Sequence, residues 1–176
     1  MGQILYPPSI VEVSGSVIFL AGPIQGADQW QEKAIKIIQT LDSSPNIACP
    51  RRPLTIRKEF GSVEYGAQVD WETHYLRRAG DSGVVMFWLA KEFNHLCKRA
   101  YAQTSRFELG EWKVRHERDG SKLVVGIEQE FTNRRYIQRR FEQDCPEIKI
   151  CSSLEETCKE TLRIISGRIS GNIRKY

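Results

Sequence analysis

Three uninterrupted apolar runs constrain the fold of this chain most strongly. They occupy residues 17–20, 83–89 and 123–127. A strand that faces solvent on one side alternates apolar and polar residues, whereas a strand covered on both sides is apolar throughout. The runs therefore predict central strands of a parallel sheet that is covered by helices on both faces.

Weaker patterns surround these runs. Turn residues and apolar spacing predict further strands at residues 10–13, 46–49 and 148–150. Helical spacing predicts five helices. The first is capped by Asp28, and the others lie at about residues 65–78, 105–117, 136–141 and from 152 onward. Gly80 is expected to end the helix over residues 65–78. Strands alternating with helices predict one three-layer α/β domain over residues 1–176. The expected sheet is flavodoxin- or Rossmann-like, with about five mainly parallel strands.

The composition of the 176 residues is typical of a soluble globular protein, with 40% apolar and 27% charged residues. Neither a bilayer-spanning run nor a signal peptide is visible, so we expect a cytoplasmic protein without a membrane partner. The net charge of +4 is mild and no aromatic-rich binding motif accompanies it, so nucleic-acid binding is not indicated. Five cysteines without a C-x-x-C pair predict reduced structural thiols and no metal site.

A small loop follows the first apolar run. Its sequence, AGPIQG at residues 21–26, contains two glycines that let a ligand approach the backbone closely. The loop is neither a G-x-G-x-x-G fingerprint nor a Walker loop. We expect ligand contacts from Gly22, Pro23, Gln25 and Gly26. The long connection over residues 54–62 is a further candidate for substrate contacts.

Glu108, within the segment SRFELGEW at residues 105–112, allows two interpretations. The spacing Ser105-x-x-Glu108 fits a capping box, and spacing alone favours this structural role. Alternatively, Glu108 lies in the crevice beyond the carboxyl ends of the strands, where open α/β sheets bind ligands. The dipole at a helix N-terminus would favour its ionised form, which suits a nucleophile. Asp81, judged alone, fits a turn before a strand.

Four segments, in order, resemble the nucleoside 2-deoxyribosyltransferase-like family. They are residues 18–23 (IFLAGP), 68–72 (QVDWE, with Gln68 and Glu72 on one helix face), 79–81 followed by the second apolar run, and 104–112 (TSRFELGEW). The resemblance implies cleavage of the N-glycosidic bond of a nucleoside or nucleotide. It implies a covalent glycosyl intermediate on Glu108 and sugar transfer to a second base or to water, without a metal or redox cofactor.

The resemblance also implies roles for other residues. Asp81 would bind or protonate the nucleobase, Asp70 would contact the substrate, and the loop over residues 21–26 would cradle the sugar or a 5′-phosphate. Arg51 is a candidate for holding that phosphate. Family members often assemble, so a homo-oligomer is consistent with it. Two alternatives stay open: a non-catalytic nucleotide-binding module of the same fold, and an interaction protein that uses its basic face.

Overall fold

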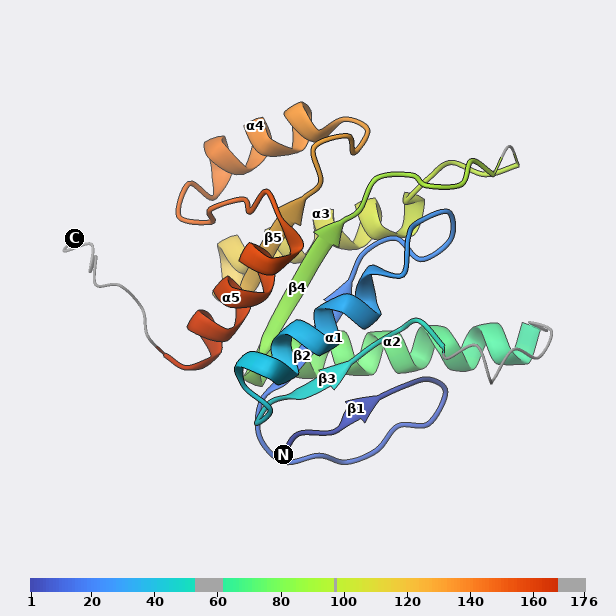
Figure 1. Ribbon diagram of the computed structural model, residues 1–176, viewed down its shortest axis with the longest axis vertical. Coiled ribbons are helices and arrows are strands. Elements are labelled where there is room, and N and C mark those ends of the chain that lie inside the picture. Colours follow the sequence, from blue (N-terminus) through green and yellow to red (C-terminus); the bar gives the residue numbers. More distant parts are fainter. Residues whose placement is uncertain (53–61, 97, 168–176) are drawn as a thin grey trace.

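The computed structural model describes residues 1–52, 62–96 and 98–167. Within them, five parallel strands form one sheet in the order β1-β3-β2-β4-β5 (Figure 1). The strands are β1 (Ile4–Leu5), β2 (Val17–Ala21), β3 (Asn46–Ala48), β4 (Val84–Leu89) and β5 (Leu123–Ile127). The predicted flavodoxin- or Rossmann-like α/β architecture is confirmed.

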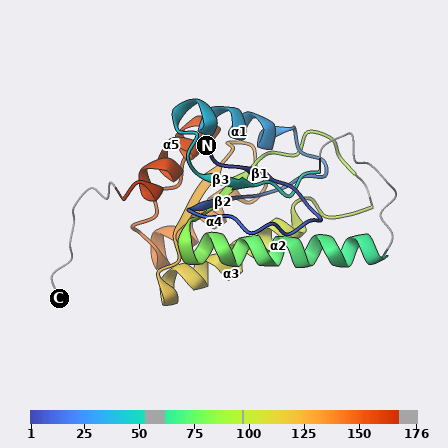
Figure 2. The same cartoon turned by 90° about the horizontal axis from the view of Figure 1, so that it is seen from below.

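Helices cover both faces of this sheet (Figure 2). Helices α1 (Trp30–Leu41) and α5 (Leu154–Ile165) lie on one face, and α2 (Ser62–Ser82) and α3 (Gln103–Asp119) lie side by side on the other. Helix α4 (Arg134–Asp144) contributes Phe141 to the same core cluster as α2 and α3. The sheet thus separates two apolar cores.

The continuous apolar runs divide their side chains between these two cores. In β2, Val17, Phe19 and Ala21 belong to the core under α2 and α3, whereas Ile18 and Leu20 belong to the core under α1 and α5. All five residues of β2 and all six of β4 are buried. Because successive strand residues point to opposite faces, a strand between two helical layers has no position for a polar side chain.

Two strand predictions were wrong. Residues 10–13 form no strand, because Val11 is held instead by Tyr75, whose hydroxyl accepts from its amide and donates to its carbonyl, each at 2.8 Å. The edge strand is β1, which pairs with β3. Residues 148–150 are also irregular, and the single residue Cys151 bridges to Gly126 in β5.

Helix boundaries also differ from the predictions. Helix α2 continues past Gly80, which was expected to end it, and reaches Ser82. A Cβ atom at position 80 would lie 2.4 Å from the Trp112 ring, so this glycine permits close packing of α3 against α2. Asp28 does not cap α1: it precedes the N-cap residue Gln29, which makes no side-chain capping hydrogen bond.

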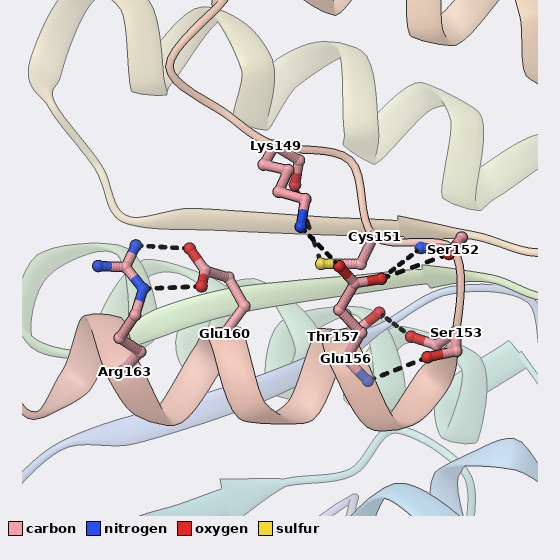
Figure 3. A network of polar contacts seen from close by, with 8 residues as sticks. All are labelled: Lys149, Cys151, Ser152, Ser153, Glu156, Thr157, Glu160 and Arg163. Carbon is pink, nitrogen blue, oxygen red and sulfur yellow. Dashed lines mark hydrogen bonds and ion pairs between the residues drawn. The ribbon is translucent and has the colours of Figure 1, made fainter. Parts of the chain in front are cut away.

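The predicted cap of α5 is confirmed (Figure 3). The Ser153 hydroxyl accepts a hydrogen bond from the Glu156 amide at 3.1 Å, and the Glu156 carboxylate accepts one from the Ser152 amide at 3.0 Å. These reciprocal bonds satisfy amides that the helix itself cannot pair.

Two further features bear on the expectations from composition. Across residues 1–52, 62–96 and 98–167, every helix is too short or too polar to cross a bilayer. Cys49, Cys145, Cys151 and Cys158 are free and buried, as expected of structural thiols. Cys97 and all but the last residue of the predicted connection over residues 54–62 lie outside the described residues.

Helix α5 packs closely on the sheet at Gly126, which has no side chain. A Cβ atom there would lie 2.1 Å from the Thr157 hydroxyl and 2.7 Å from the Trp88 ring, so Gly126→Ala is expected to lower the free energy of unfolding by about 2 kcal/mol. Gly110→Ala is the control, because a Cβ atom in that exposed position of α3 meets nothing within 4 Å. It should stabilise the protein by about 0.5–1 kcal/mol. Urea unfolding of both variants measures the difference, and equal effects would contradict this packing.

Candidate active site

The topology creates a crevice between β2 and β4. The chain leaves β2 toward α1 on one face of the sheet and leaves its neighbour β4 toward α3 on the other (Figure 2). Ligands of open α/β sheets bind where neighbouring connections diverge in this way. A cavity of about 790 Å³ opens at this point.

Most of the predicted site residues line this cavity. Of the eight, all but Asp70 and Asp81 belong to its wall, namely Gly22, Pro23, Gln25, Gly26, Arg51 and Glu108. The wall is built from β2 and the loop after it, the start of α1, the segment after β3, the first three turns of α2, the segment between β4 and α3, and the first two turns of α3.

Asp81 and Glu108 are not brought together. Helix α2 begins near the cavity and ends before β4, so Asp81, in its last turn, is exposed near the amino end of the sheet. It lies nine residues beyond Glu72, which corresponds to about 14 Å along a helix axis. The turn predicted around Asp81 does not form, because α2 continues through Gly80. Asp70 is also exposed and outside the cavity wall.

The glycine loop after β2 is held tightly in place. Gly22 has a φ of 148°, and a Cβ atom there would lie 2.2 Å from the carbonyl oxygen of Trp88 in β4. The Gly26 carbonyl accepts hydrogen bonds from the amides of Phe93 and Asn94 at 2.7 and 3.0 Å. The backbone of this loop therefore forms a fixed wall of the cavity, and only glycine fits at position 22.

Arg51 holds this loop in place through hydrogen bonds to it and to α1. Its Nε atom donates to the Gln31 side chain at 3.0 Å, and its Nη2 atom donates to the carbonyls of Ile24 and Asp28 at 2.9 and 3.2 Å. These donors are committed to the protein itself. Arg51 thus shapes the cavity wall, while its predicted contact with a phosphate stays a prediction.

The capping-box interpretation of Glu108 was wrong. Helix α3 begins at Gln103, and its N-cap residue Ala102 is left-handed, with a φ of 57° and no side-chain capping bond. Ser105 lies buried within the first turn. Among the residues that the structure describes, none forms a hydrogen bond with the Glu108 carboxyl group. The side chain is therefore available to a ligand in the cavity.

Glu108 also differs from the prediction in its protonation. Burial, followed by repulsion from Glu72 and Glu111, raises its pKa to about 8. The prediction of an ionised carboxylate relied on the helix dipole, which acts mainly within the first turn. Because α3 starts two residues earlier than predicted, Glu108 lies in the second turn, where burial determines its charge.

Glu72 is the functional candidate that sequence reasoning missed. It lines the same cavity from α2, and burial raises its pKa as well, although a hydrogen bond from Gln68 and the charge of Arg52 partly oppose the shift. The sequence did show Gln68 and Glu72 on one helix face, but nothing local indicated that this face meets Glu108. Two neighbouring carboxyl groups in a low-dielectric site tend to share one proton.

The segment between β4 and α3 closes the cavity on another side. The Tyr101 hydroxyl donates to the carbonyls of Ala90 and Lys91 at 2.7 and 2.9 Å, which fixes its ring against the Gly26 backbone. Arg99 donates to the Gln25 side chain across the cavity wall. Neither residue was distinguished by the sequence patterns.

A smaller hollow of about 400 Å³ lies between α5 and the segment that precedes it (Figure 3). Its charged side chains pair with one another, as Lys149 does with Glu156 at 2.9 Å and Arg163 with Glu160 at 2.6 Å. Burial raises the pKa of the Cys151 thiol to about 11, so the thiol stays protonated and unreactive. This hollow offers no comparable chemistry.

No protein-family model and no curated protein matches the sequence. The family resemblance therefore depends on the four segments alone, and three of them reach the cavity through Gly22, Glu72 and Glu108. Among the described residues, no three His, Cys, Asp or Glu side chains group closely enough to hold a metal ion.

The raised pKa of Glu108 has a consequence for stability. The folded protein keeps a proton that the unfolded chain, with the ordinary value of 4.5, releases, so this group destabilises the fold increasingly as pH rises from 4.5 toward 8. Glu108→Gln should therefore raise the free energy of unfolding by about 3 kcal/mol near neutral pH, with the gain vanishing below about pH 4.5. Urea unfolding across this pH range tests the effect. Glu142→Gln, an exposed change in α4 away from the cavity, is the control and should show no such gain.

Proposed function

We propose that this cavity cleaves the N-glycosidic bond of a nucleoside or nucleotide through a covalent glycosyl intermediate on Glu108. The observation that carries the proposal is the pair of carboxyl groups, Glu72 and Glu108, in one cavity at the carboxyl ends of the strands, both with raised pKa values. Cleaving such a bond with retention needs a carboxylate that attacks and an acid that protonates the leaving group. A pair that shares one proton supplies both.

The first step uses the singly protonated pair. The charge of Glu72 helps to raise the pKa of Glu108, so the proton rests on Glu108 and must pass to Glu72 to give the reactive form, in which Glu108 is ionised. A Glu108 oxygen attacks the anomeric carbon and forms a C–O bond while the C–N bond breaks. The electron pair of the broken bond goes to the base, and the Glu72 proton neutralises it. Departure of a neutral base is easier than departure of an anion, which is the reason an acid is required.

The second step releases the sugar. Water or a second base attacks the anomeric carbon, and the C–O bond to Glu108 breaks. The attacking group gives its proton to Glu72, which restores the singly protonated pair. With water the products are free sugar and free base, and with a second base the product is a new nucleoside. Glu72 takes the acid role that the resemblance had suggested for Asp81, because Asp81 lies outside the cavity.

The other features of the cavity support this proposal. The fixed backbone of Gly22 and Gly26 can approach a sugar closely, and the cavity of about 790 Å³ falls in the range of small-molecule sites. The apolar side chains of Tyr65, Val69 and Leu96 line the same cavity and can contact a base. A nucleoside or nucleotide thus fits both its chemistry and its size.

Base release tests the assignment of Glu108. The protein is incubated with a panel of ribo- and deoxyribonucleosides and their 5′-monophosphates, and free base is measured by chromatography. Glu108→Gln should lower base release by at least about 1000-fold, because the nucleophile is lost. The control Glu142→Gln changes an exposed carboxylate in α4, away from the cavity, and should stay within about twofold.

Mass spectrometry of the intact protein should also show an adduct of sugar mass that is absent from Glu108→Gln. Unchanged base release in Glu108→Gln would refute the nucleophile assignment. Binding of a nucleotide without release of base from any substrate would instead indicate a non-catalytic binding module.

The pH dependence distinguishes the roles of the two carboxyl groups. For the wild type, kcat/KM should fall at low pH, where both groups are protonated, and again above about 8, where the shared proton is lost. In Glu72→Gln the repulsion on Glu108 disappears and its pKa drops. Activity should then be lower and rise with pH to a plateau, with no loss near 8.

Asp70→Asn is the matched control on the same helix, outside the cavity, and should keep the bell-shaped profile. If kcat/KM of Glu72→Gln fell as Glu108 ionised, Glu108 would be the acid and the proposed roles would be wrong.

A further inference from the structure

Gln68 is a buried amide whose two N–H donors both have acceptors. It lies on α2, one turn before Glu72, with 8% of its surface exposed. Its Nε2 atom donates to the Pro50 carbonyl at 3.1 Å and to Oε1 of Glu72 at 2.7 Å, and its Oε1 atom accepts from Nε of Arg52 at 2.9 Å. Nε2 carries two hydrogens, so both have a partner.

These partners fix the orientation of the amide. A guanidinium group only donates and a backbone carbonyl only accepts, so a flipped amide would face Arg52 with its nitrogen and Pro50 with its oxygen. Both contacts would then be repulsive. The NH₂ group must therefore point toward Glu72, and Oε1 of Glu72 is held as a hydrogen-bond acceptor.

We propose that Gln68 is the positioning residue of the carboxyl pair: oriented by Arg52 and Pro50, it fixes the Glu72 side chain and leaves Oε2 as the oxygen that carries the transferable proton. Oε1 of Glu72 accepts the short hydrogen bond from Gln68, so a proton on Oε1 could not point toward that donor. The transferable proton is therefore assigned to Oε2. The inference rests on the proposed function, because the proton is the one that the departing base would receive.

Two neighbours favour the ionised form of Glu72: the Gln68 amide through its hydrogen bond and Arg52 through its charge. The charged groups that share the cavity are Arg51 and Arg52 after β3, Glu32 of α1, Glu108 of α3, and Glu92 and Arg99 of the segment before α3. Burial raises the pKa of Glu72, while the Gln68 hydrogen bond and then Arg52 lower it. Without the Gln68 donor, Glu72 would hold its proton to higher pH and release it less readily to a base.

Gln68→Met tests this role, because methionine has a similar volume but no donor. We expect kcat to fall by about tenfold with KM little changed, and the acid limb of the kcat/KM profile to move upward by about one pH unit. A role limited to packing would lower activity without moving the limb. Arg52→Met should move the limb in the same direction, since it removes both the orienting contact and a positive charge. Gln143→Met, an exposed change in α4, is the control and should leave the profile unchanged.

A measurement without substrate separates this inference from the proposed function. In protein with ¹³C-labelled glutamate, the Glu72 carboxyl signal is identified by its absence from Glu72→Gln and titrated by NMR. Its midpoint should rise by about one pH unit in Gln68→Met and stay unchanged in Gln143→Met. An unmoved midpoint would overturn the role of Gln68 even if the wild type releases base. A wild type that releases no base would overturn the proposed function, while the titration still decides the hydrogen bond.

Discussion

Burial of β2 and β4 on both faces is the constraint on which the rest of the structure depends. Their side chains alternate into two apolar cores, so neither strand can carry a polar group along its length. Polar chemistry is therefore confined to the strand ends and to the helices that flank them. The cavity lies there, and the groups that line it come from the segments after β2, β3 and β4 and from helices α1, α2 and α3.

The carboxyl pair depends on this arrangement in a second way. Glu72 and Glu108 extend from two helices on the same face of the sheet into one cavity, where burial makes their charged forms costly. Each group raises the cost of ionising the other, and the pair keeps a proton that isolated glutamates would lose. The fold thus gives two identical side chains raised pKa values through burial and through their proximity.

Much of this molecule could be predicted from its sequence, but the site only in part. The apolar runs identified β2, β4 and β5 because burial on both faces leaves a direct compositional signal. The glycine loop was singled out because it follows such a strand, and Glu108 because it lies in a segment that resembles a known family. Glu72 was not, because its importance arises from packing between α2 and α3, which local patterns do not encode. Asp81 was misplaced because Gly80 resembles a helix end, whereas here its missing side chain admits Trp112.

The contact between Gly80 and Trp112 bears on the two carboxyl groups as well. It lies about two helical turns beyond Glu72 on α2 and about one turn beyond Glu108 on α3. Any side chain at position 80 would push the helices apart, so their separation is set at a point that no ligand reaches. The distance between Glu72 and Glu108, and with it the strength of their electrostatic coupling, thus depends on the contact between Gly80 and Trp112, which lies outside the cavity. Substitutions at this crossing would therefore change the coupling between the two carboxyl groups without altering any residue that lines the cavity.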